Sequence, residues 1–357
     1  MKRIALVSDA WAPQVNGVVR TLQTTAGILR ERGWAVTPIT PDRFRSIPCP
    51  TYPEIRLALT WPGAIGRMIE RADVGAVHIA TEGPLGLAAR RHCLDVGRPF
   101  TTSFHTRFPD YLHARFGLSP KLSWRYLSWF HGPARSVLAA TPRLAEELGT
   151  HGIGRTRLWS RGVDLARFRP GLPPPEAFLA LPRPILLNVG RVAVEKNIEA
   201  FLNTPAPGSK VVVGDGPALA DLRMRFPDVH FMGALEGEAL ARAYSGADLF
   251  VFPSRTDTFG LVLVEAMASG LPVAAYPVGG PLDVVGGSDA GVLHETLGEA
   301  IRLALRIPRA AALAHGRSFS WQAAASQFEA AVADCLADTE RLQRAGEVLA
   351  DSLSPAH

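Results

Sequence analysis

The sequence is poor in cysteine and has no long apolar run. Its 357 residues include three cysteines, Cys49, Cys93 and Cys335. Because they are odd in number, widely separated and without metal-ligand spacing, they argue against a disulfide scaffold and a cysteine-bound metal, and a reducing cytoplasm is expected. The apolar run at the N-terminus is too short for a signal peptide, and no later stretch reaches membrane-spanning length. We therefore expect a cytoplasmic protein, either soluble or peripheral to a membrane.

Acidic residues are scarce in the first half of the chain. Through Pro170, Lys and Arg number 24 against 12 Asp and Glu, whereas the remainder has 14 against 21. The first half thus carries about +12 and the second about −7, which together give the net charge of +5. A basic half joined to an acidic half suggests that one domain meets an anionic partner. An uneven but solvated surface is the alternative.

The length predicts about two domains, and both halves alternate short apolar strands with amphipathic helices. A proline-rich stretch over 171–184 is the expected linker, and 42–59, with three prolines, is expected to be irregular. We predict strands in the first half at 4–7, 34–40, 76–79, 100–103 and 136–140. In the second half we predict strands at 185–189, 211–213, 229–232, 249–252 and 273–276.

The most informative stretch is 248–276, which reads as strand, loop, helix, turn and strand. In an open α/β sheet, ligands bind beyond the carboxyl ends of the strands, where helix N-termini direct backbone N–H groups outward. This places Asp257, Thr258, Phe259 and Gly260 at a site suited to an anion or a sugar hydroxyl. Glu265 follows on a mostly apolar helix, where an ionised carboxylate is costly unless it has a partner.

The same stretch resembles a known family. Two acidic residues separated by seven, with Phe-Gly between them and an EAMASGLPV tail, are similar to the sugar-nucleotide site of retaining GT-B glycosyltransferases of the family-4 group. The resemblance implies that Asp257 holds the transferred sugar and that Glu265 holds the nucleotide ribose. Glu is the commonest family residue at the first position, so Asp257 is a departure that leaves the sugar open.

Further family motifs lie earlier in the second half. Residues 190–197, GRVAVEKN, match an element whose Arg191 and Lys196 neutralise the donor diphosphate, with Glu195 as their partner. Two cations at a strand end would offset the charge that builds on the leaving group. Gly190 belongs to this element, and Gly214 opens a second matching turn, GDGP.

The resemblance also assigns two positions in the first half. Gly17 follows the first strand in a loop that lacks the G-x-G-x-x-G dinucleotide fingerprint, and the family places it opposite the donor diphosphate across an interdomain cleft. A glycine there allows close backbone approach or a positive φ, although a plain turn is the alternative. His105 follows a strand end, where the family histidine contacts the donor sugar near the reacting centre.

Residues 107–133 interleave aromatic and basic side chains. Rings at the headgroup level and cations toward anionic phosphates are typical of an interfacial helix, each cation contributing about 1 kcal/mol. A buried helical pair with core aromatics is the alternative; nucleic acid is disfavoured because no binding module accompanies the segment. The residues that we assign to acceptor or membrane contact are Arg107, Tyr111, Arg115, Lys121, Trp124, Arg125 and Trp129.

The segment 159–164, WSRGVD, is a variant of another family signature, in which Arg161 replaces the usual Asn. This variant resembles the branch that makes membrane glycolipids, including sulfolipid synthases and diacylglycerol glycosyltransferases. The family fold implies two Rossmann-like α/β domains facing across a cleft, with a C-terminal helix that returns to the first domain. The expected division is a first, acceptor- and membrane-facing domain at 1–170, a linker at 171–184, a nucleotide-sugar domain at 185–318, the returning helix at 319–340 and a frayed tail at 341–357.

The expected function is transfer of a hexosyl unit from a nucleotide diphosphate sugar to a membrane lipid, with diacylglycerol favoured, giving an α-glycolipid. The chemistry implied is front-face attack with the departing diphosphate accepting the proton, after domain closure. A retaining glycoside hydrolase would need one carboxylate as nucleophile and another as acid. We find no such pair, because the resemblance assigns both carboxylates to donor binding. No metal or other cofactor is expected, because Arg191, Lys196 and helix N-termini supply positive charge and no Asp-x-Asp motif occurs.

Several alternatives stay open. A GDP-mannose- or UDP-sugar-dependent α-glycosyltransferase could act on a polyprenyl-linked or soluble saccharide. A regulatory module that binds a nucleotide sugar without turnover fits less well, because the motif residues look intact. A nicotinamide dehydrogenase is a poorer fit, because the first loop of this chain lacks the dinucleotide-binding fingerprint and no ribose-binding acid is evident at the spacing that such enzymes require. The expected partners are therefore a nucleotide sugar, a lipid acceptor and the anionic inner face of the cell membrane, while the base, the sugar and the oligomeric state are undetermined.

Overall fold

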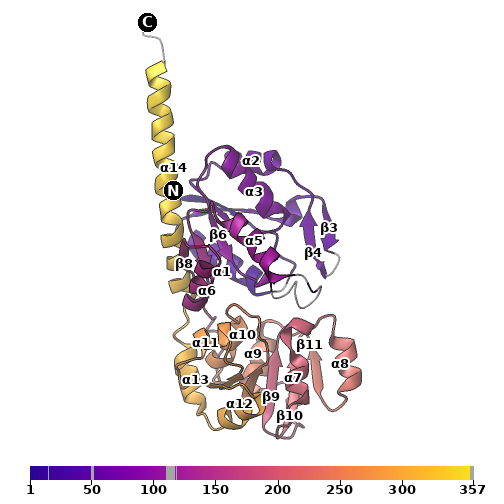
Figure 1. Ribbon diagram of the computed structural model, residues 1–357. Coiled ribbons are helices and arrows are strands. Elements are labelled where there is room, and N and C mark those ends of the chain that lie inside the picture. Colours follow the sequence, from indigo (N-terminus) through magenta and orange to yellow (C-terminus); the bar gives the residue numbers. More distant parts are fainter. Residues whose placement is uncertain (15, 50–51, 110–116, 118, 354–357) are drawn as a thin grey trace. The chain divides into compact units, whose positions relative to one another are not determined.

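A computed structural model gives the fold and describes residues 1–14, 16–49, 52–109, 117 and 119–353. The chain divides into two compact units (Figure 1). The first unit contains Met1–Pro109, Leu118–Ser160 and the chain from Ala324 onward, and the second contains Arg161–Ala323. The chain thus passes from the first unit to the second and back again.

The first unit is built on a parallel sheet in which the first strand lies inside the sheet. The strand order is β2-β1-β5-β6-β7-β8, and every neighbouring pair is parallel. The inner strands β1, β5, β6 and β7 are almost entirely buried, as is typical of parallel strands covered by helices on both faces. The strands are β1 (Arg3–Val7), β2 (Ala35–Ile39), β5 (Ala76–Ile79), β6 (Thr101–Phe104), β7 (Val137–Ala139) and β8 (Thr156–Leu158).

Two helices of the first unit begin at a capping side chain. The Asn16 side chain accepts the backbone N–H of Val19 at the start of α1, and Thr141 caps α6 with Pro142 in the first helical turn. The helices are α1 (Gly17–Glu31), η1 (Pro41–Arg43), α2 (Pro62–Arg71), α3 (Pro84–Asp95), α5 (Pro120–His131) and α6 (Pro142–Thr150).

The expectation that 42–59 is irregular was wrong. This region contains an antiparallel two-stranded ribbon, in which β3 (Ser46–Cys49) pairs with β4 (Tyr52–Ala58). The prolines misled the prediction because proline is excluded only from central strands, and each strand of an isolated ribbon has a free edge. The Arg56 side chain also reaches across the ribbon and donates to the Ser46 carbonyl at 2.6 Å.

The second unit has its own parallel sheet, in the order β11-β10-β9-β12-β13-β14. Numbered along the chain, this is the 3-2-1-4-5-6 order of a doubly wound nucleotide-binding fold. The reversal of strand order lies between β9 and β12. The strands are β9 (Ile185–Val189), β10 (Ser209–Val213), β11 (His230–Gly233), β12 (Leu249–Phe252), β13 (Val273–Ala275) and β14 (Gly291–Leu293).

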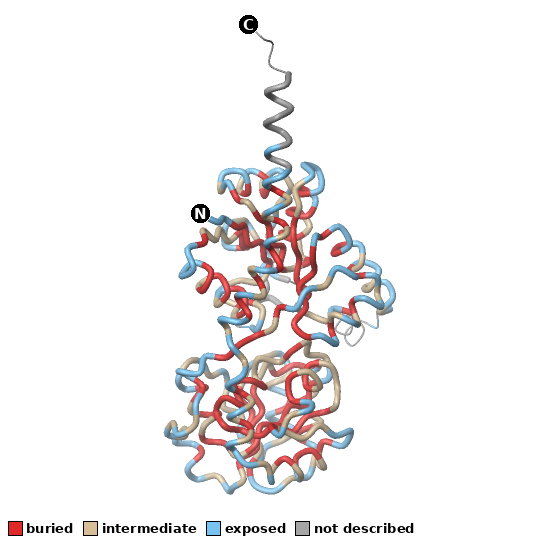
Figure 2. Tube along the Cα trace, turned by 90° about the vertical axis from the view of Figure 1, so that its left-hand side faces the viewer, coloured by how far each residue is buried: buried red, intermediate tan, exposed pale blue. Residues whose placement is uncertain are grey.

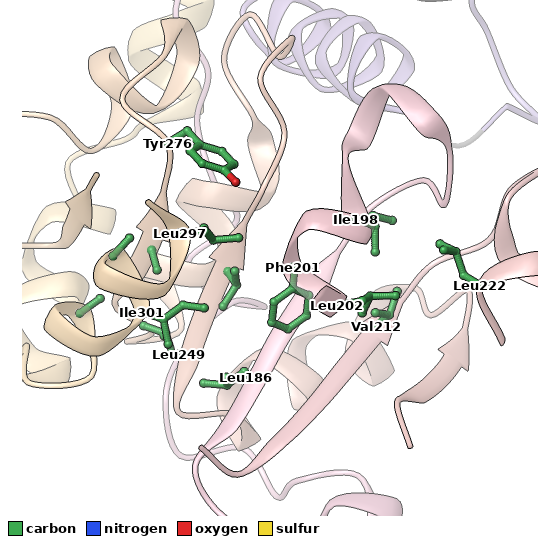
Figure 3. Close-up of a cluster of buried hydrophobic side chains, with 14 of the residues drawn as sticks. Leu186, Ile198, Phe201, Leu202, Val212, Leu222, Leu249, Tyr276, Leu297 and Ile301 are labelled. Atoms are coloured by element: carbon green, nitrogen blue, oxygen red, sulfur yellow. The ribbon is translucent and has the colours of Figure 1, made fainter. Parts of the chain in front are cut away.

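Helices cover both faces of this second sheet. On one face, α7 (Ile198–Asn203), α8 (Leu219–Arg225) and α12 (Leu297–Ala304) enclose a hydrophobic cluster with Leu186, Phe201 and Leu249 (Figure 3). The second unit also contains α9 (Gly237–Gly246), α10 (Leu261–Ala268), α11 (Gly279–Val284) and α13 (Arg309–Gly316), and two short helices, η2 (Glu176–Phe178) and η3 (Val194–Lys196). Buried residues occupy the interior of each unit (Figure 2), and they include nearly all residues of its inner strands.

The last helix, α14 (Trp321–Leu353), joins the first unit from Ala324 onward. Phe328 packs its ring 4.9 Å from those of Trp159 and His78, and Glu329 accepts from the Trp34 indole. The returning C-terminal helix is therefore confirmed. The helix continues as far as Leu353, through residues that were expected to form a tail. Of the helices that the structure describes, none is both long and apolar enough to cross a membrane.

Candidate functional site

The carboxyl edge of the second sheet is shaped by glycines that let two loops touch. Gly190 follows β9 and Gly214 follows β10, with φ values of +154° and +146°. A Cβ on Gly214 would lie 1.8 Å from the Gly190 carbonyl oxygen, and one on Gly216 would lie 2.4 Å from that of Val192. No other residue fits at these contacts, so the sequence holds the two loops together by omitting side chains.

Lys196 and Asp257 meet at this edge. Lys196 ends η3, and its Nζ lies 2.6 Å from the Asp257 Oδ1, with the two side chains 22% and 18% exposed. The other carboxylate oxygen of Asp257, Oδ2, is buried and has no hydrogen-bond partner among the described residues. A buried acceptor without a donor is costly, so this oxygen is suited to a ligand hydroxyl.

The loop that carries Asp257 is fixed by close backbone packing. The Gly280 N–H donates to the Asp257 carbonyl at 3.2 Å, and a Cβ on Gly280 would lie 2.9 Å from the Phe259 carbonyl oxygen. Gly260 enters α10 with φ +84°, a conformation that other residues rarely adopt. Phe259 is buried edge-on against Phe319, 6.0 Å between ring centroids. Thr258 lies half-buried between these anchors.

Glu265 has a partner that sequence reasoning missed. Its side chain is 3% exposed on α10, and the Tyr244 hydroxyl donates to its Oε2 at 3.0 Å. Tyr244 is fully buried near the end of α9, with its ring against those of Phe168 and Phe250. The sequence indicates that a buried acid requires a donor and that a buried tyrosine requires an acceptor. It does not show that these two residues pair, because they come together only in the folded chain.

The remaining residues of the matched element lie in the loop after β9. Arg191 is half-buried directly after Gly190, and Glu195 is buried. The Thr256 hydroxyl donates to the Glu195 carbonyl at 3.2 Å, and the Asn197 amide donates to that of Pro253 at 3.0 Å. These bonds join the loops that follow β9 and β12. The structure therefore gathers the second-unit candidates, from Gly190 to Glu265, on two linked loops and the helix that follows.

The first-unit candidates lie at the carboxyl edge of the other sheet. Gly17 is the first residue of α1, directly after its cap. His105 follows β6, and its Nε2 lies 2.9 Å from the Ser103 Oγ, while its ring meets the edge of Trp159 at 5.5 Å. The sequence predicted this strand-end place for His105 but not the ring and hydroxyl that hold it.

A polar cluster at the same edge was also missed. The buried Asp9 accepts the N–H groups of Leu85 and Gly86 at the start of α3, and burial raises the pKa of its carboxyl. Glu82 lies 3.2 Å from the Nε2 of His131, which is itself buried. Asp9 therefore caps α3, and the contact between Glu82 and His131 joins the loop after β5 to the end of α5.

The aromatic–basic segment is divided between buried and exposed faces. Trp124 of α5 stacks on His151, 3.7 Å between ring centroids, and on Phe104 at 5.9 Å. Arg107 forms a two-bond ion pair with Glu147, with both bonds between 2.6 and 2.8 Å. Neither side chain therefore belongs to the exposed face of α5.

The exposed face of α5 keeps a mixed apolar and cationic character. Leu122 is 66% and Trp129 is 53% exposed, and Lys121 and Arg125 are exposed beside them. The guanidinium of Arg90 lies 3.9 Å from the Trp129 ring centroid. Tyr111 and Arg115, which the sequence also assigned to this surface, lie outside the described residues.

The variant signature at 159–164 contributes packing. Trp159 is fully buried, and Arg161 is buried with a pKa lowered to about 9 by that burial. A Cβ on Gly162 would lie 2.1 Å from the Trp321 backbone nitrogen. The signature therefore requires a glycine at position 162, where the chain passes close to the start of α14.

The described residues offer neither a metal-ligand grouping nor a thiol of lowered pKa. Within the described ranges, His, Cys, Asp and Glu side chains form no group of three that could hold a metal ion. Cys93 and Cys335 are free and buried, and burial raises the pKa of each thiol to about 12. Neither thiol has the low pKa of a reactive cysteine.

Two family models match the chain. Residues 15–167 match glycosyltransferase family 4, and residues 183–308 match the glycosyl transferases of group 1. The first match begins after β1 and runs beyond β8, and the second runs from just before β9 to the residue before α13.

Characterised relatives are similar over most of the chain. A GDP-mannose-dependent alpha-mannosyltransferase of Mycolicibacterium smegmatis is 32% identical over 83% of this chain and 85% of its own length. The sulfoquinovosyl transferase SQD2 of Arabidopsis thaliana is 31% identical over 80% of this chain and 61% of its own length. An alpha-monoglucosyldiacylglycerol synthase of Streptococcus pneumoniae is 26% identical over 77% of this chain and 71% of its own.

Solved structures share the fold. A sucrose-phosphate synthase of Thermosynechococcus elongatus has a TM-score of 0.75 at 24% identity, covering 92% of this chain and 97% of its own. Anabaena HepE in complex with UDP-glucose has a TM-score of 0.69 at 16% identity, covering 95% and 100%. Together with the parallel sheets and the returning helix, these similarities confirm the predicted fold class. The chain belongs to glycosyltransferase family 4 and is a hexosyltransferase of the retaining type.

Proposed function

We propose that this enzyme transfers a hexosyl unit from a nucleotide diphosphate sugar to the hydroxyl of diacylglycerol or a related membrane lipid, forming an α-glycolipid. The observation that carries the donor half is the Lys196–Asp257 pair: the second carboxylate oxygen of Asp257, Oδ2, is buried and has no donor in the described part of the chain. It lies on glycine-lined loops at the carboxyl edge of a doubly wound sheet, the place where such folds bind nucleotides.

Different residues of the second unit would bind the diphosphate and the hydroxyls of the donor. Lys196 and Arg191 would neutralise the diphosphate and stabilise the charge that develops as it departs. Asp257 would accept hydroxyls of the transferred sugar through Oδ2, and Glu265 would accept those of the ribose. His105 would contact the sugar near the reacting carbon, as the family resemblance implies.

The diphosphate leaving group would complete the proton balance. The acceptor hydroxyl attacks the anomeric carbon on the face that the diphosphate leaves, and its proton passes to the departing phosphate oxygen. Because Lys196 and Arg191 supply the positive field, we propose that transfer needs no metal. Assaying the purified enzyme with excess chelator tests directly whether transfer needs a metal.

The lipid half of the proposal rests on the first unit and on two relatives. The exposed Leu122 and Trp129 lie on one face of α5 with Lys121 and Arg125 beside them. An apolar face flanked by cations fits the headgroup region of an anionic membrane, to which the first half of the chain brings about +12. Among the relatives, one is named for diacylglycerol glucosylation and one for sulfoquinovosyl transfer. We therefore place the enzyme at the inner face of the cell membrane, peripherally bound.

A second acceptor class has a specific observation in its favour. Several similar proteins are named GDP-mannose-dependent alpha-mannosyltransferases, at 29–32% identity. Under this alternative the enzyme would transfer a sugar from GDP-mannose or a UDP-sugar to a polyprenyl-linked or soluble saccharide. It would then bind membranes through its acceptor rather than through anionic lipid.

One screen separates these possibilities. The purified chain is incubated with anionic vesicles that contain diacylglycerol, and with UDP-glucose, UDP-glucuronate, UDP-sulfoquinovose or GDP-mannose in separate tubes. Lipid products are resolved by mass spectrometry. A hexosyl-diacylglycerol would identify donor and acceptor together. Slow donor hydrolysis without a lipid product would retain the transferase and reject diacylglycerol as its acceptor.

A further inference from the structure

An arginine lies over a tyrosine ring at the carboxyl edge of the second sheet. The central guanidinium carbon of Arg255 is 3.7 Å from the centroid of the Tyr276 ring. Tyr276 is 8% exposed and belongs to the buried cluster that Figure 3 shows, whereas Arg255 is exposed. A ring fixed in the core thus carries a cation at the surface.

The two residues follow neighbouring strands. The strands β12 and β13 are parallel, and their register ends at the last residue of each, so the chain leaves both at the same level. Tyr276 directly follows β13, and Arg255 lies in the loop after β12, two residues before Asp257. The Arg255–Tyr276 pair therefore belongs to the same sheet edge as the proposed donor site.

The pair lies on the side of this edge that the other cations leave open. Asp257 meets Lys196 of the loop after β9, and Arg191 lies in that same loop. Those two cations are the ones assigned to the diphosphate. Because β12 lies between β9 and β13 in the sheet, Arg255 contacts Tyr276 on the opposite side of its loop. It is a further cation, next to the residue that we assign to the transferred sugar.

The chemistry of Arg255 suits an anion with two or more oxygens. A guanidinium is always charged and carries five N–H donors in a planar fork, which matches the oxygens of a carboxylate or a sulfonate. Contact with an aromatic face still allows these donors to bond to an anion. In the described part of the chain, no carboxylate forms an ion pair with Arg255.

We propose that Arg255 is a specificity-determining residue, which binds the carboxylate or sulfonate of an anionic donor sugar. The proposal rests on the proposed donor site, in which Asp257 contacts the transferred sugar. A negatively charged sugar beside Asp257 is repelled by that carboxylate unless a cation lies close by. Arg255 supplies this cation, and Tyr276 is a positioning residue that holds it at the edge. The substrate class is a nucleotide diphosphate hexuronate or sulfosugar.

Donor binding without an acceptor tests this proposal. The purified chain is titrated in a calorimeter with donors that differ at the terminal carbon of the hexose. UDP-glucose is compared with UDP-glucuronate and UDP-sulfoquinovose, and GDP-mannose with GDP-mannuronate, so that either base is covered. We expect the wild type to bind one anionic sugar at least about tenfold more tightly than its neutral counterpart, the effect of a charged hydrogen bond. Equal affinity for neutral and anionic sugars would overturn the proposal.

Variants of Arg255 then identify the group that it binds. Arg255→Gln should remove the preference and leave the affinities for the neutral sugar and for UDP or GDP alone within about twofold. Arg255→Lys, which keeps the charge without the planar fork, should keep part of the preference. Arg306→Gln is the matched control, because it removes an exposed arginine that follows the end of α12. An equal loss for every donor and for the free diphosphate, or no loss for any, would refute the sugar contact.

Variants of Tyr276 test the positioning role. Tyr276→Leu should weaken the preference for the anionic sugar by about twofold to fivefold, the usual contribution of a cation over a ring. Tyr276→Phe keeps the ring and should retain the wild-type preference. An unchanged preference in a Tyr276→Leu protein with a cooperative thermal transition would refute this role.

The proposed function fails in a different way. A wild-type chain that binds no nucleotide sugar of either base would refute the donor site, and the proposed specificity with it. A chain that binds neutral and anionic donors equally would refute the specificity alone and leave the transferase as proposed.

Discussion

At the residue scale, the two carboxylates of the second-unit site are held in different ways. Asp257 shares an ion pair with Lys196 through one oxygen, and its other oxygen has no partner among the described residues. Glu265 is more deeply buried and receives a neutral donor, the Tyr244 hydroxyl. A charge pair can be exchanged for a charged ligand, whereas a hydroxyl donor fixes its acceptor in place. Asp257 and Lys196 are thus the groups that a donor would rearrange.

Replacing Lys196 by Ala should reduce kcat/KM by about 10²–10³-fold, the usual effect of losing one group that stabilises a developing charge. The fold should persist, because the Lys196 side chain lies at the sheet edge and is 22% exposed. Steady-state kinetics and thermal unfolding measure the two effects. Turnover within a factor of three of the wild type would remove Lys196 from the diphosphate role.

Replacing Tyr244 by Phe should destabilise the protein by about 1–3 kcal/mol, because the buried Glu265 loses a donor. It should also raise the KM for the donor, since Glu265 is the proposed ribose contact. Urea unfolding and donor titration measure both. Tyr126→Phe is the control: its hydroxyl donates at 2.7 Å to the Glu82 carbonyl and its side chain is 38% exposed. Equal effects of the two substitutions would argue against a specific role for Tyr244.

At the scale of elements, α5 combines a packed face with an exposed one. Trp124 is stacked between His151 and Phe104, so the structure assigns it to packing. Leu122, Arg125 and Trp129 recur at helical spacing on the exposed side. The sequence identified the segment but not its faces, because aromatic residues occur on both. A test of membrane binding must therefore leave Trp124 intact.

The triple variant Leu122→Ser, Arg125→Ser and Trp129→Ser should weaken binding to anionic vesicles at least about tenfold. It removes two apolar anchors and one cation, and the cation alone contributes about 1 kcal/mol. Vesicle sedimentation measures the change. The matched control is Leu179→Ser, Arg223→Ser and Met224→Ser, three exposed positions of the second unit, which should leave binding unchanged. Undiminished binding by the α5 variant would mean that its exposed face does not meet lipid.

The loops after β9 and β10 depend on glycine. Gly214→Ala should destabilise the second unit by about 3 kcal/mol or more and abolish donor binding, because its Cβ would overlap the Gly190 carbonyl oxygen. Gly149→Ala is the control, since Gly149 lies in α6 with nothing within 4 Å of an added Cβ. That substitution should be neutral or stabilise by up to about 1 kcal/mol. A Gly214→Ala protein with wild-type Tm and donor affinity would show that the loops need no close contact.

At the scale of the whole molecule, the buried His78 couples folding to pH. The pKa of this residue is about 6.5 in the unfolded chain, and burial lowers the pKa to about 3 in the folded chain. Between these values the unfolded state holds more protons, so stability falls as the pH falls. The loss from this residue is about 1.4 kcal/mol per pH unit below 6.5. Above pH 6.5 the residue makes no such contribution.

Replacing His78 by Gln should therefore flatten the decline in the free energy of unfolding between pH 6.5 and 5. The comparison is made by urea unfolding at each pH, with His294→Gln as the control because His294 is exposed. An identical pH dependence in wild type and His78→Gln would show that this histidine is not the source of the acid sensitivity.

Much of the fold was predictable from local pattern. The strands at 76–79, 185–189 and 249–252 were predicted at their observed bounds, because each is a short apolar run that a parallel sheet buries on both faces. The ribbon at 46–58 was missed because its prolines resemble loop composition, and the pairing that tolerates them is not local. The helix beyond 340 was missed because its sequence has no strong stop before Leu353 and was interpreted as a tail.

Motif spacing named residues that the structure brings together in the second unit. Gly190, Lys196, Asp257 and Glu265 were named from motif spacing, and all four lie on the linked loops and helix at one sheet edge. What spacing could not supply was the set of partners. Tyr244, Ser103 and Asp9 are ordinary residues in the sequence, and their importance comes from elements that meet only after folding.

The sequence alone determined the alternation of buried strands and helices, the two-part division and the family's motif residues. These follow from periodicity, from glycine and proline placement, and from the chemistry that a motif requires. The tertiary structure alone decided which oxygen of Asp257 meets Lys196, which face of α5 is exposed and which nitrogen of His105 meets Ser103. Such facts depend on distances of about 3 Å between residues far apart in the chain. Local patterns constrain the elements, whereas hydrogen-bond partners are fixed only when the elements pack.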